Sequence, residues 1–284
     1  MLARALGGEA AVVAVELRPP RAELGSLEGM DAWIDSYHEI RRLGRHRVPA
    51  FLTDSAVGTQ EENSLRHLSA NLGRELPRDL VTPFLTSKHS LDFCLSYAQQ
   101  AWQQGFSSLV VLGGDTSVGR PRCVEHAWDL RRLIHESEPR LSLGGWANPH
   151  ASAAQQVDFL LDSRFCAEFY LTQVVSHLNL ERVKRFLDEV DHRQPPLPGM
   201  FNVFYYRSAS PKTLATLSRF MPVPVEGLVK EFGDGATAVD VCARTLRAMR
   251  SLGVRHFCIC NLPMQDAWST LSAILEKANS RLPI

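Results

Sequence analysis

The chain has 284 residues and a mass of 31.7 kDa, close to the length of about 250 residues that one (β/α)₈ barrel takes. Hydrophobic residues make up 45% and charged residues 22%, so the chain can bury a large core and is not disordered as a whole. Lys and Arg number 31, Asp and Glu also number 31, and no basic block supplies the charge that attracts nucleic acid or an anionic membrane. We therefore expect one globular domain over residues 1–284 that binds neither.

The first apolar run, Ala10–Val15, is too short to span a bilayer and is followed by no small-residue cleavage site. Six cysteines are scattered along the chain without CxxC spacing, so we expect reduced thiols in a cytoplasmic protein and no metal site. Cys258 and Cys260 alternate along an apolar run, which on a strand directs both to one face. Core packing is the favoured role for this pair.

Short apolar runs rich in β-branched residues recur along the chain and predict strands. There are eight of them: Ala11–Leu17, Val48–Thr53, Leu80–Thr86, Ser108–Gly113, Leu141–Trp146, Glu168–Val174, Gly199–Tyr205 and His256–Cys260.

Stretches of helical period follow nearly every predicted strand: Asp31–Leu43, Leu91–Gln104, Val124–Glu136, Ala151–Asp162, Leu180–Val190, Pro211–Phe220, Ala236–Leu252 and Pro263–Ala278. Eight alternating units without a Pro/Gly/Ser-rich linker favour a single α/β domain with the (β/α)₈ (TIM) barrel fold over an open doubly wound sheet. Active sites of such barrels lie at the carboxyl ends of the strands, so polar residues there are the candidates for chemistry.

Two carboxylates end predicted strands. Glu16 closes the run Val12–Val15 just before two prolines, and Asp115 follows Gly113 and Gly114 after the fourth strand. A rim glutamate paired with Arg18 explains Glu16 about equally well, and the N-cap of the next helix is a common role for an Asp after a strand.

Four further polar or aromatic residues lie at strand ends. Trp146 ends the fifth strand and His150 follows it, Gln173 lies near the end of the sixth and Thr53 ends the second. An amide such as Gln173 can read a neutral heterocycle through paired hydrogen bonds. Helix capping or simple loop polarity explains His150 and Gln173 almost as well one by one. Thr86 and Ser87 at the end of the third strand add hydroxyl groups, and six strand ends with such residues meeting at one mouth favour a site.

Taken in order, several motifs resemble the methylenetetrahydrofolate reductase family. They are Val-Glu-Leu-Arg-Pro-Pro at 15–20, Gly-Gly-Asp at 113–115, Ala-Asn-Pro-His at 147–150 and Leu-Thr-Gln at 171–173, followed by Pro198-Gly199, His256-Phe257 and Asn261. The resemblance covers nearly the whole chain, and its specificity comes from the set rather than from one motif. It implies a (β/α)₈ barrel that reduces 5,10-methylenetetrahydrofolate to 5-methyltetrahydrofolate with NADH or NADPH, usually through FAD.

The resemblance also assigns roles to single residues. Glu16 matches the family's general acid, which protonates N10 of the substrate as the five-membered ring opens, and burial would raise its pKa for that task. Asp115 matches an aspartate that binds the pterin and stabilises the developing cation, and Gln173 matches a second substrate-binding residue. Thr53 and His150 match cofactor-binding positions, and Trp146 stands where the family usually has tyrosine.

Three departures from the family fall on the flavin side. Phe84 replaces a histidine, Gly113 replaces an arginine, and Asp162 aligns without gaps to a helix lysine, although a short gap would put Arg164 there instead. Each lost charge-assisted hydrogen bond to the flavin phosphates is worth about 1.5–3 kcal/mol. We therefore disfavour tightly bound FAD and expect direct hydride transfer from the nicotinamide. No GxGxxG motif follows a strand, so the nicotinamide would bind at the barrel mouth.

Two other classes of function remain open. The barrel could be a folate-binding partner protein of one-carbon metabolism that reduces nothing, keeping Asp115 and Gln173 as ligands. It could also be an unrelated barrel enzyme, such as a Schiff-base aldolase, for which Lys88 after the third strand is the nearest candidate.

Overall fold

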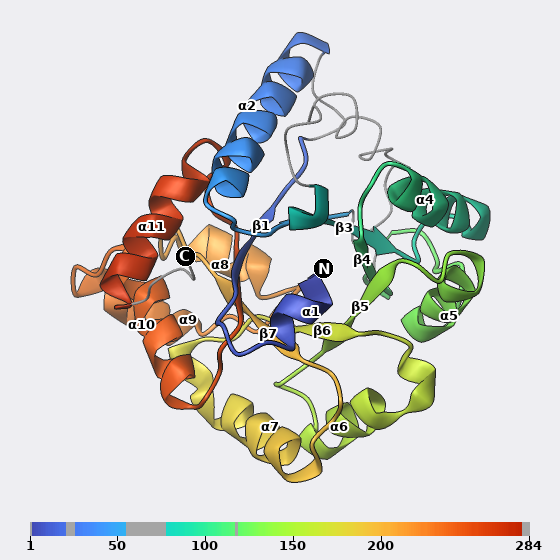
Figure 1. Cartoon of the computed structure of the whole chain (residues 1–284). Coiled ribbons are helices and arrows are strands. Elements are labelled where there is room, and N and C mark those ends of the chain that lie inside the picture. Colours follow the sequence, from blue (N-terminus) through green and yellow to red (C-terminus); the bar gives the residue numbers. More distant parts are fainter. Residues whose placement is uncertain (1, 21–25, 55–77, 117–118, 280–284) are drawn as a thin grey trace.

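The computed structural model describes residues 2–20, 26–54, 78–116 and 119–279. Eight parallel strands close into a barrel in chain order, which confirms the predicted (β/α)₈ fold (Figure 1). The strands are β1 (Val13–Leu17), β2 (Ala50–Leu52), β3 (Val81–Thr86), β4 (Ser108–Leu112), β5 (Ser142–Ala147), β6 (Phe169–Thr172), β7 (Gly199–Phe204) and β8 (Phe257–Cys260). Every predicted strand overlaps an observed one, with ends that differ by at most two residues.

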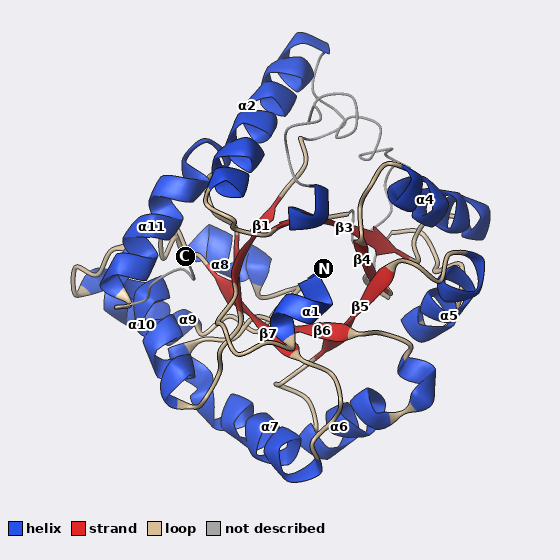
Figure 2. Cartoon of the chain, viewed as in Figure 1, coloured by secondary structure: helices blue, strands red, loops and turns tan. Residues whose placement is uncertain are grey.

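Helices form a ring around the strands (Figure 2). They are α2 (Ser26–Arg45), α4 (Leu91–Gln103), α5 (Ala127–Ser137), α6 (Ala153–Leu161), α7 (Leu180–Arg193), α8 (Pro211–Leu217), α9 (Val225–Gly233), α10 (Ala238–Ser251) and α11 (Ala267–Lys277), with α1 (Leu2–Leu6) before the first strand. None of the described helices is long and apolar enough to cross a membrane.

The sequence patterns did not predict α1 or α9. The prolines before α9 and its Gly227 and Gly233 are typical of a loop. The helix forms because Leu228 is fully buried against the apolar cluster inside the barrel, a contact that no local pattern reveals.

Alternating side chains along each strand build two apolar layers. Inward-facing residues such as Ala14, Phe51 and Val110 fill the barrel, while outward-facing residues such as Val15 and Val111 pack beneath the helices. Both faces of the sheet are therefore covered, which explains the nearly continuous apolar runs in the sequence.

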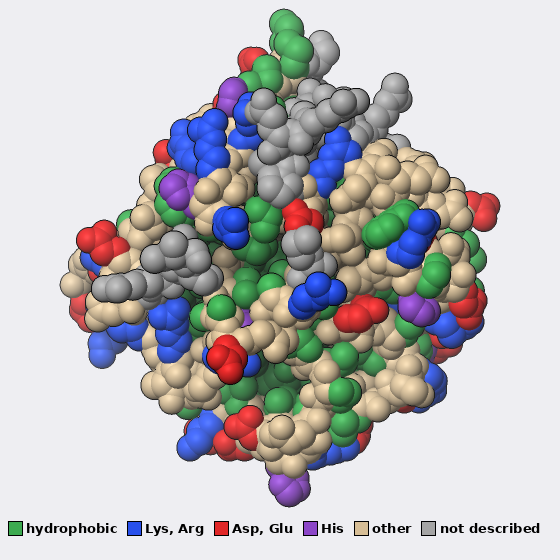
Figure 3. Space-filling view, viewed as in Figure 1, with side chains coloured by type: hydrophobic (Ala, Val, Ile, Leu, Met, Phe, Trp, Pro, Cys, Tyr) green, Lys and Arg blue, Asp and Glu red, His purple; other side chains and the backbone are tan. Residues whose placement is uncertain are grey.

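The N-terminal helix α1 lies across the middle of the ring of strands in Figure 1. Its Leu2 and Leu6 are buried and join Val12 in the interior cluster, so α1 closes the end of the barrel at which the strands begin. On this face, acidic and basic side chains are mixed around the rim and apolar groups gather in the middle (Figure 3). The strand ends that are candidates for chemistry lie at the opposite end of the barrel.

Gly145 on β5 packs against the ring of Phe165 so closely that no side chain larger than a hydrogen atom fits there. A Cβ at that position would lie 2.4 Å from Cζ of Phe165, whose ring is buried. We expect Gly145→Ala to lower the free energy of unfolding by about 1–3 kcal/mol, as measured by urea denaturation.

The matched control is Gly233→Ala on α9, where nothing lies within 4 Å of the added Cβ. This change should be neutral or should stabilise the protein by up to about 1 kcal/mol through helix propensity. Equal effects of the two substitutions would contradict the tight packing of β5 against Phe165.

Candidate functional site

The closed barrel gathers the predicted site residues at one end. Because all eight strands are parallel, their carboxyl ends surround a single mouth. Each of these residues lies in the last part of a strand or in the segment that follows it: Glu16 on β1, Thr53 after β2, Asp115 after β4, Trp146 on β5 with His150 after it, and Gln173 after β6.

Glu16 faces the interior of the barrel. It alternates with Val12 and Ala14, both members of the interior cluster, and is partly exposed. Burial raises the pKa of its carboxyl group above the usual 4.5, while the thiol of Cys260 and the charge of Arg18 offset part of that rise. A carboxylic acid that keeps its proton to higher pH is suited to general acid catalysis.

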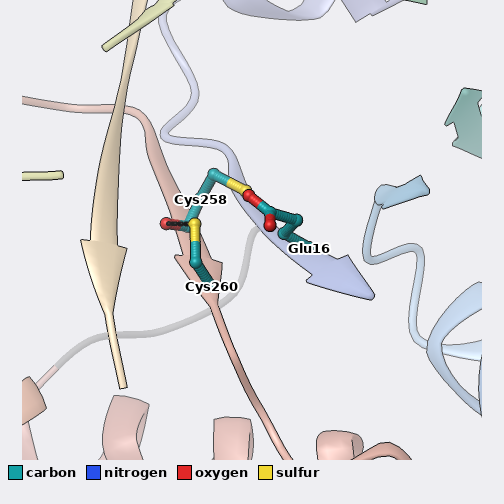
Figure 4. A group of neighbouring side chains, drawn as sticks. All are labelled: Glu16, Cys258 and Cys260. Carbon is teal, nitrogen blue, oxygen red and sulfur yellow. Dashed lines mark hydrogen bonds between the residues drawn. The ribbon is translucent and has the colours of Figure 1, made fainter. Parts of the chain in front are cut away.

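Two thiols accompany Glu16 (Figure 4). A carboxylate oxygen of Glu16 and the Sγ atoms of Cys258 and Cys260 lie within 4.8 Å of one another, because β8 pairs with β1 in a register that sets Glu16 beside Cys260. Burial raises the pKa of the Cys258 thiol, and that neighbouring thiol together with burial raises the pKa of Cys260. Metal coordination needs thiolates. The raised pKa values instead favour three neutral groups packed together.

The segment after β4 carries Asp115 on a glycine turn. Gly114 has a φ of 73°, a conformation that favours glycine, and Asp115 beyond it is partly buried. The guanidinium group of Arg122 covers Gly113, since a Cβ there would lie 2.6 Å from Cζ of Arg122, and Nη2 of Arg122 donates to the Gly114 carbonyl at 2.6 Å. A positive charge thus stands where the sequence comparison indicated a lost arginine.

The β5 and β6 ends lie side by side. The backbone N–H of Gln173 donates to the Ala147 carbonyl at 2.8 Å, and the Gln173 side-chain oxygen accepts from Val174 N–H at 2.9 Å. The His150 ring contacts the Val174 carbonyl through Nε2 at 2.7 Å. Burial lowers the pKa of His150, so the neutral ring is favoured and Nε2–H donates this bond.

Trp146 points into the barrel beside this pair of strand ends. Its ring packs against the interior cluster and stays partly exposed. It therefore offers an aromatic surface between the Glu16 side and the Gln173 side of the mouth, which is suited to stacking a flat heterocycle.

A hydrogen-bond network joins the ends of β2 and β3. Asp54, next to Thr53, accepts from Thr86 N–H at 2.7 Å, from Thr86 Oγ1 at 2.9 Å and from His89 Nε2 at 2.8 Å. Thr53 is fixed in turn by its N–H bond to the Leu17 carbonyl at 3.1 Å. The network braces the part of the rim where the sequence predicted a cofactor contact at Thr53.

Asp162 lies away from the mouth. It caps the end of α6, seven residues before β6 begins, so it lies near the end of the barrel at which the strands start. Arg164 pairs with it at 2.6 Å. The repulsion of flavin phosphates that the sequence comparison attributed to Asp162 therefore does not act at the mouth. Phe84, the third departure, is buried in the barrel interior.

Lys88, the candidate for Schiff-base chemistry, is buried, and its Nζ donates to the Arg120 carbonyl at 2.6 Å. A Schiff-base lysine needs an amine that is free to attack a carbonyl carbon, whereas the Lys88 amino group is already bonded to a backbone carbonyl. The geometry thus favours a structural role for Lys88.

Sequence reasoning missed Arg122 and Asn202. The guanidinium group of Arg122 contacts Gly113 nine positions earlier in the chain, and no local pattern predicts that contact. Asn202 did carry a signal, because it stands between Met200 and Phe204 at the inward-facing spacing of an otherwise apolar strand.

No protein-family model matches the chain, and no curated protein matches it. Among solved structures, the chain is similar to an uncharacterized protein from Clostridium thermocellum that binds two copies of 5-methyl-5,6,7,8-tetrahydrofolic acid. The TM-score is 0.64 at 15% identity, over 98% of this chain and 97% of that one. Dihydropteroate synthase from Thermus thermophilus gives a TM-score of 0.48 at 12% identity, over 95% of this chain and 94% of that one. At 15% identity, the similarity to the Clostridium thermocellum protein shows the fold alone.

Proposed function

We propose that this protein is a methylenetetrahydrofolate reductase, which reduces 5,10-methylenetetrahydrofolate to 5-methyltetrahydrofolate with NADH or NADPH. The observation that carries the proposal is Glu16, a carboxyl group inside the barrel near the mouth with a pKa raised by burial. Simple binding of a reduced folate needs no acid at this position. The folate bound by the Clostridium thermocellum protein is the product of the proposed reaction.

Glu16, Asp115 and Gln173 have separate roles in the proposed reaction. Glu16 donates a proton to N10, the N10–CH₂ bond breaks, and the ring opens to a cationic iminium at N5. Hydride then adds to the one-carbon unit, so one NAD(P)H and one proton are consumed for each methyl group formed. The carboxylate of Asp115 stabilises the cation, and the amide of Gln173 binds the pterin.

We propose further that the nicotinamide gives its hydride directly, without tightly bound FAD. Phe84 in place of the family's histidine supports this form of the reaction, whereas Arg122 restores a positive charge beside Gly113 and Asp162 is distant. When bound, FAD would relay hydride between the two substrates. Thr53, Trp146 and His150 are the residues that would contact a cofactor.

Two measurements test the reductase activity and the direct hydride transfer. They are the absorbance spectrum of the purified protein and the oxidation of NADH with methylenetetrahydrofolate, in the presence and absence of FAD. We expect a colourless protein that oxidises NADH without added FAD and shows sequential kinetics, since both substrates must be bound together. A yellow protein with FAD-dependent turnover would overturn direct transfer and keep the reductase. A colourless protein that is inactive in both conditions yet binds reduced folate would favour the folate-binding partner.

A further inference from the structure

The side chain of Asn202 is the most unusual polar group inside the barrel. It alternates on β7 with Met200 and Phe204, both of the interior cluster, and is only 1% exposed. Among the residues that the structure describes, neither its Oδ1 nor its Nδ2 has a hydrogen-bond partner. Burying an amide without partners costs free energy, so such a group calls for a physical explanation.

The strand register places Asn202 level with Glu16. Asn202 pairs with Cys258 on β8, and Cys258 pairs with Ala14 on β1. The register can be followed from strand to strand once around the barrel. A path that starts at Arg18, directly after β1, comes back to the same segment of the chain at Ala10, so the barrel closes with a shift of eight residues. A shift of eight residues over eight strands is one residue per strand, or two residues between alternate strands. The pairs lead from Asn202 on β7 to Ala14 on β1, so the residue of β1 at the same height along the barrel axis is Glu16, two positions further on.

By the same offset, this level of the barrel consists of four inward-facing side chains: Glu16, Phe84, Trp146 and Asn202. Of these four side chains, Glu16 and Trp146 are partly exposed, whereas Phe84 and Asn202 are buried. The layer beneath it, which includes Phe51, Val110 and Cys258, is fully buried. The Asn202 level is thus the floor of the site.

An amide at that floor offers a donor and an acceptor side by side. This pattern matches the neighbouring C=O and N–H groups of a pterin ring. An apolar ligand could satisfy neither group, and a purely anionic ligand could satisfy only the donor. Gln173 provides the same chemistry from the rim, where its side-chain oxygen is already bonded to Val174 N–H.

We propose that Asn202 is a binding residue for the pterin of a reduced folate, with its amide reserved for the ligand at the cost of stability in the free protein. The inference rests on the proposed function, since it assigns the ligand of the same site. Binding residues that weaken the free protein are a known trade-off of functional sites.

The test is Asn202→Leu, which keeps the approximate volume and removes both polar atoms. We expect the dissociation constant for 5-methyltetrahydrofolate, measured by calorimetry, to rise about 10- to 100-fold. The melting temperature of the free protein should stay the same or rise. Asn202→Ala, which adds no branching, should show the same loss of affinity.

Ser108→Ala is the matched control. Ser108 begins β4, is 1% exposed and has an Oγ without a partner in the described part of the chain, but it lies at the far end of the barrel. It should leave folate binding unchanged.

The outcomes separate the inference from the proposed function. Wild-type affinity in both Asn202 variants, or a loss of more than about 5 °C in the melting temperature of both, would overturn the role of Asn202 and leave the reductase standing. A wild-type protein that binds no reduced folate would overturn the proposed function and this inference with it.

Discussion

Replacing Glu16 by Gln should lower the turnover of methylenetetrahydrofolate by about 10²- to 10⁴-fold, the range that a positioned general acid contributes. Gln has the same shape and can still form hydrogen bonds, but it cannot release a proton to N10. The dissociation constant for 5-methyltetrahydrofolate should change by less than about threefold, because one polar contact is kept. Steady-state kinetics and calorimetry on the same preparations measure the two quantities.

Glu39→Gln is the matched control for this substitution. Glu39 on α2 is also buried, and burial raises its pKa as well, but it lies outside the barrel and accepts a bond from Trp268 N–H. Its replacement should leave turnover unchanged. If Glu16→Gln kept turnover within tenfold of the wild type, Glu16 would not be the general acid.

The pH dependence of the wild-type reaction follows from the same group. The acid must be protonated to act, so kcat/KM should fall as the pH rises through the raised pKa of Glu16. Because burial moves this pKa upward from 4.5, the decline should begin at a higher pH than an exposed glutamate would give. This limb of the profile should be missing in Glu16→Gln.

Replacing Arg131 by Met should lower the free energy of unfolding by about 3–5 kcal/mol, the typical cost of breaking a buried charged hydrogen-bonding group. Arg131 on α5 is 2% exposed, and its guanidinium group donates to the Phe165 carbonyl at 2.8 Å and to the Val111 carbonyl at 3.0 Å. It also lies over the Phe165 ring at 4.6 Å. Met fills part of the volume but leaves both carbonyls without these donors.

The next residue on the helix provides the control. Arg132 is exposed and pairs with Glu136 at 2.7 Å, a surface ion pair worth about 0–1 kcal/mol. Arg132→Met should therefore change the urea midpoint very little. Similar losses for the two substitutions would show that the Arg131 contacts to β4 and Phe165 contribute no more than surface charge does.

The positions of the strands were predictable because each signal is local. Runs such as Val110–Leu112 are apolar and rich in β-branched residues whatever the rest of the chain does, and an amphipathic helix such as α7 follows a strand and leads to the next one. Helix α9 was not predicted because Leu228 is buried in an apolar cluster whose other members lie far away in the sequence.

The sequence also indicated that the candidate site residues share one end of the barrel, because Glu16, Asp115 and Gln173 each lie where an apolar run stops. It misjudged charge at the mouth. An alignment by sequence order counts Gly113 as a lost positive charge and Asp162 as an added negative charge. In the structure, the guanidinium group of Arg122 covers Gly113, and Asp162 lies at the C-terminal end of α6, away from the mouth. Charge acts through space, and neither position follows from sequence order.

By itself, then, the sequence determined the fold class, the approximate bounds of the strands and the place of Glu16 at the end of the first strand, since these depend on periodicity and on which residue ends each strand. Only the tertiary structure decided that Glu16 is grouped with Cys258 and Cys260 and stands level with Asn202. Those relations depend on the register between strands and on the closure of the barrel. Register is set by contacts between residues far apart in sequence, such as the bond from Val12 N–H to the His256 ring across 244 positions, and no local pattern encodes it.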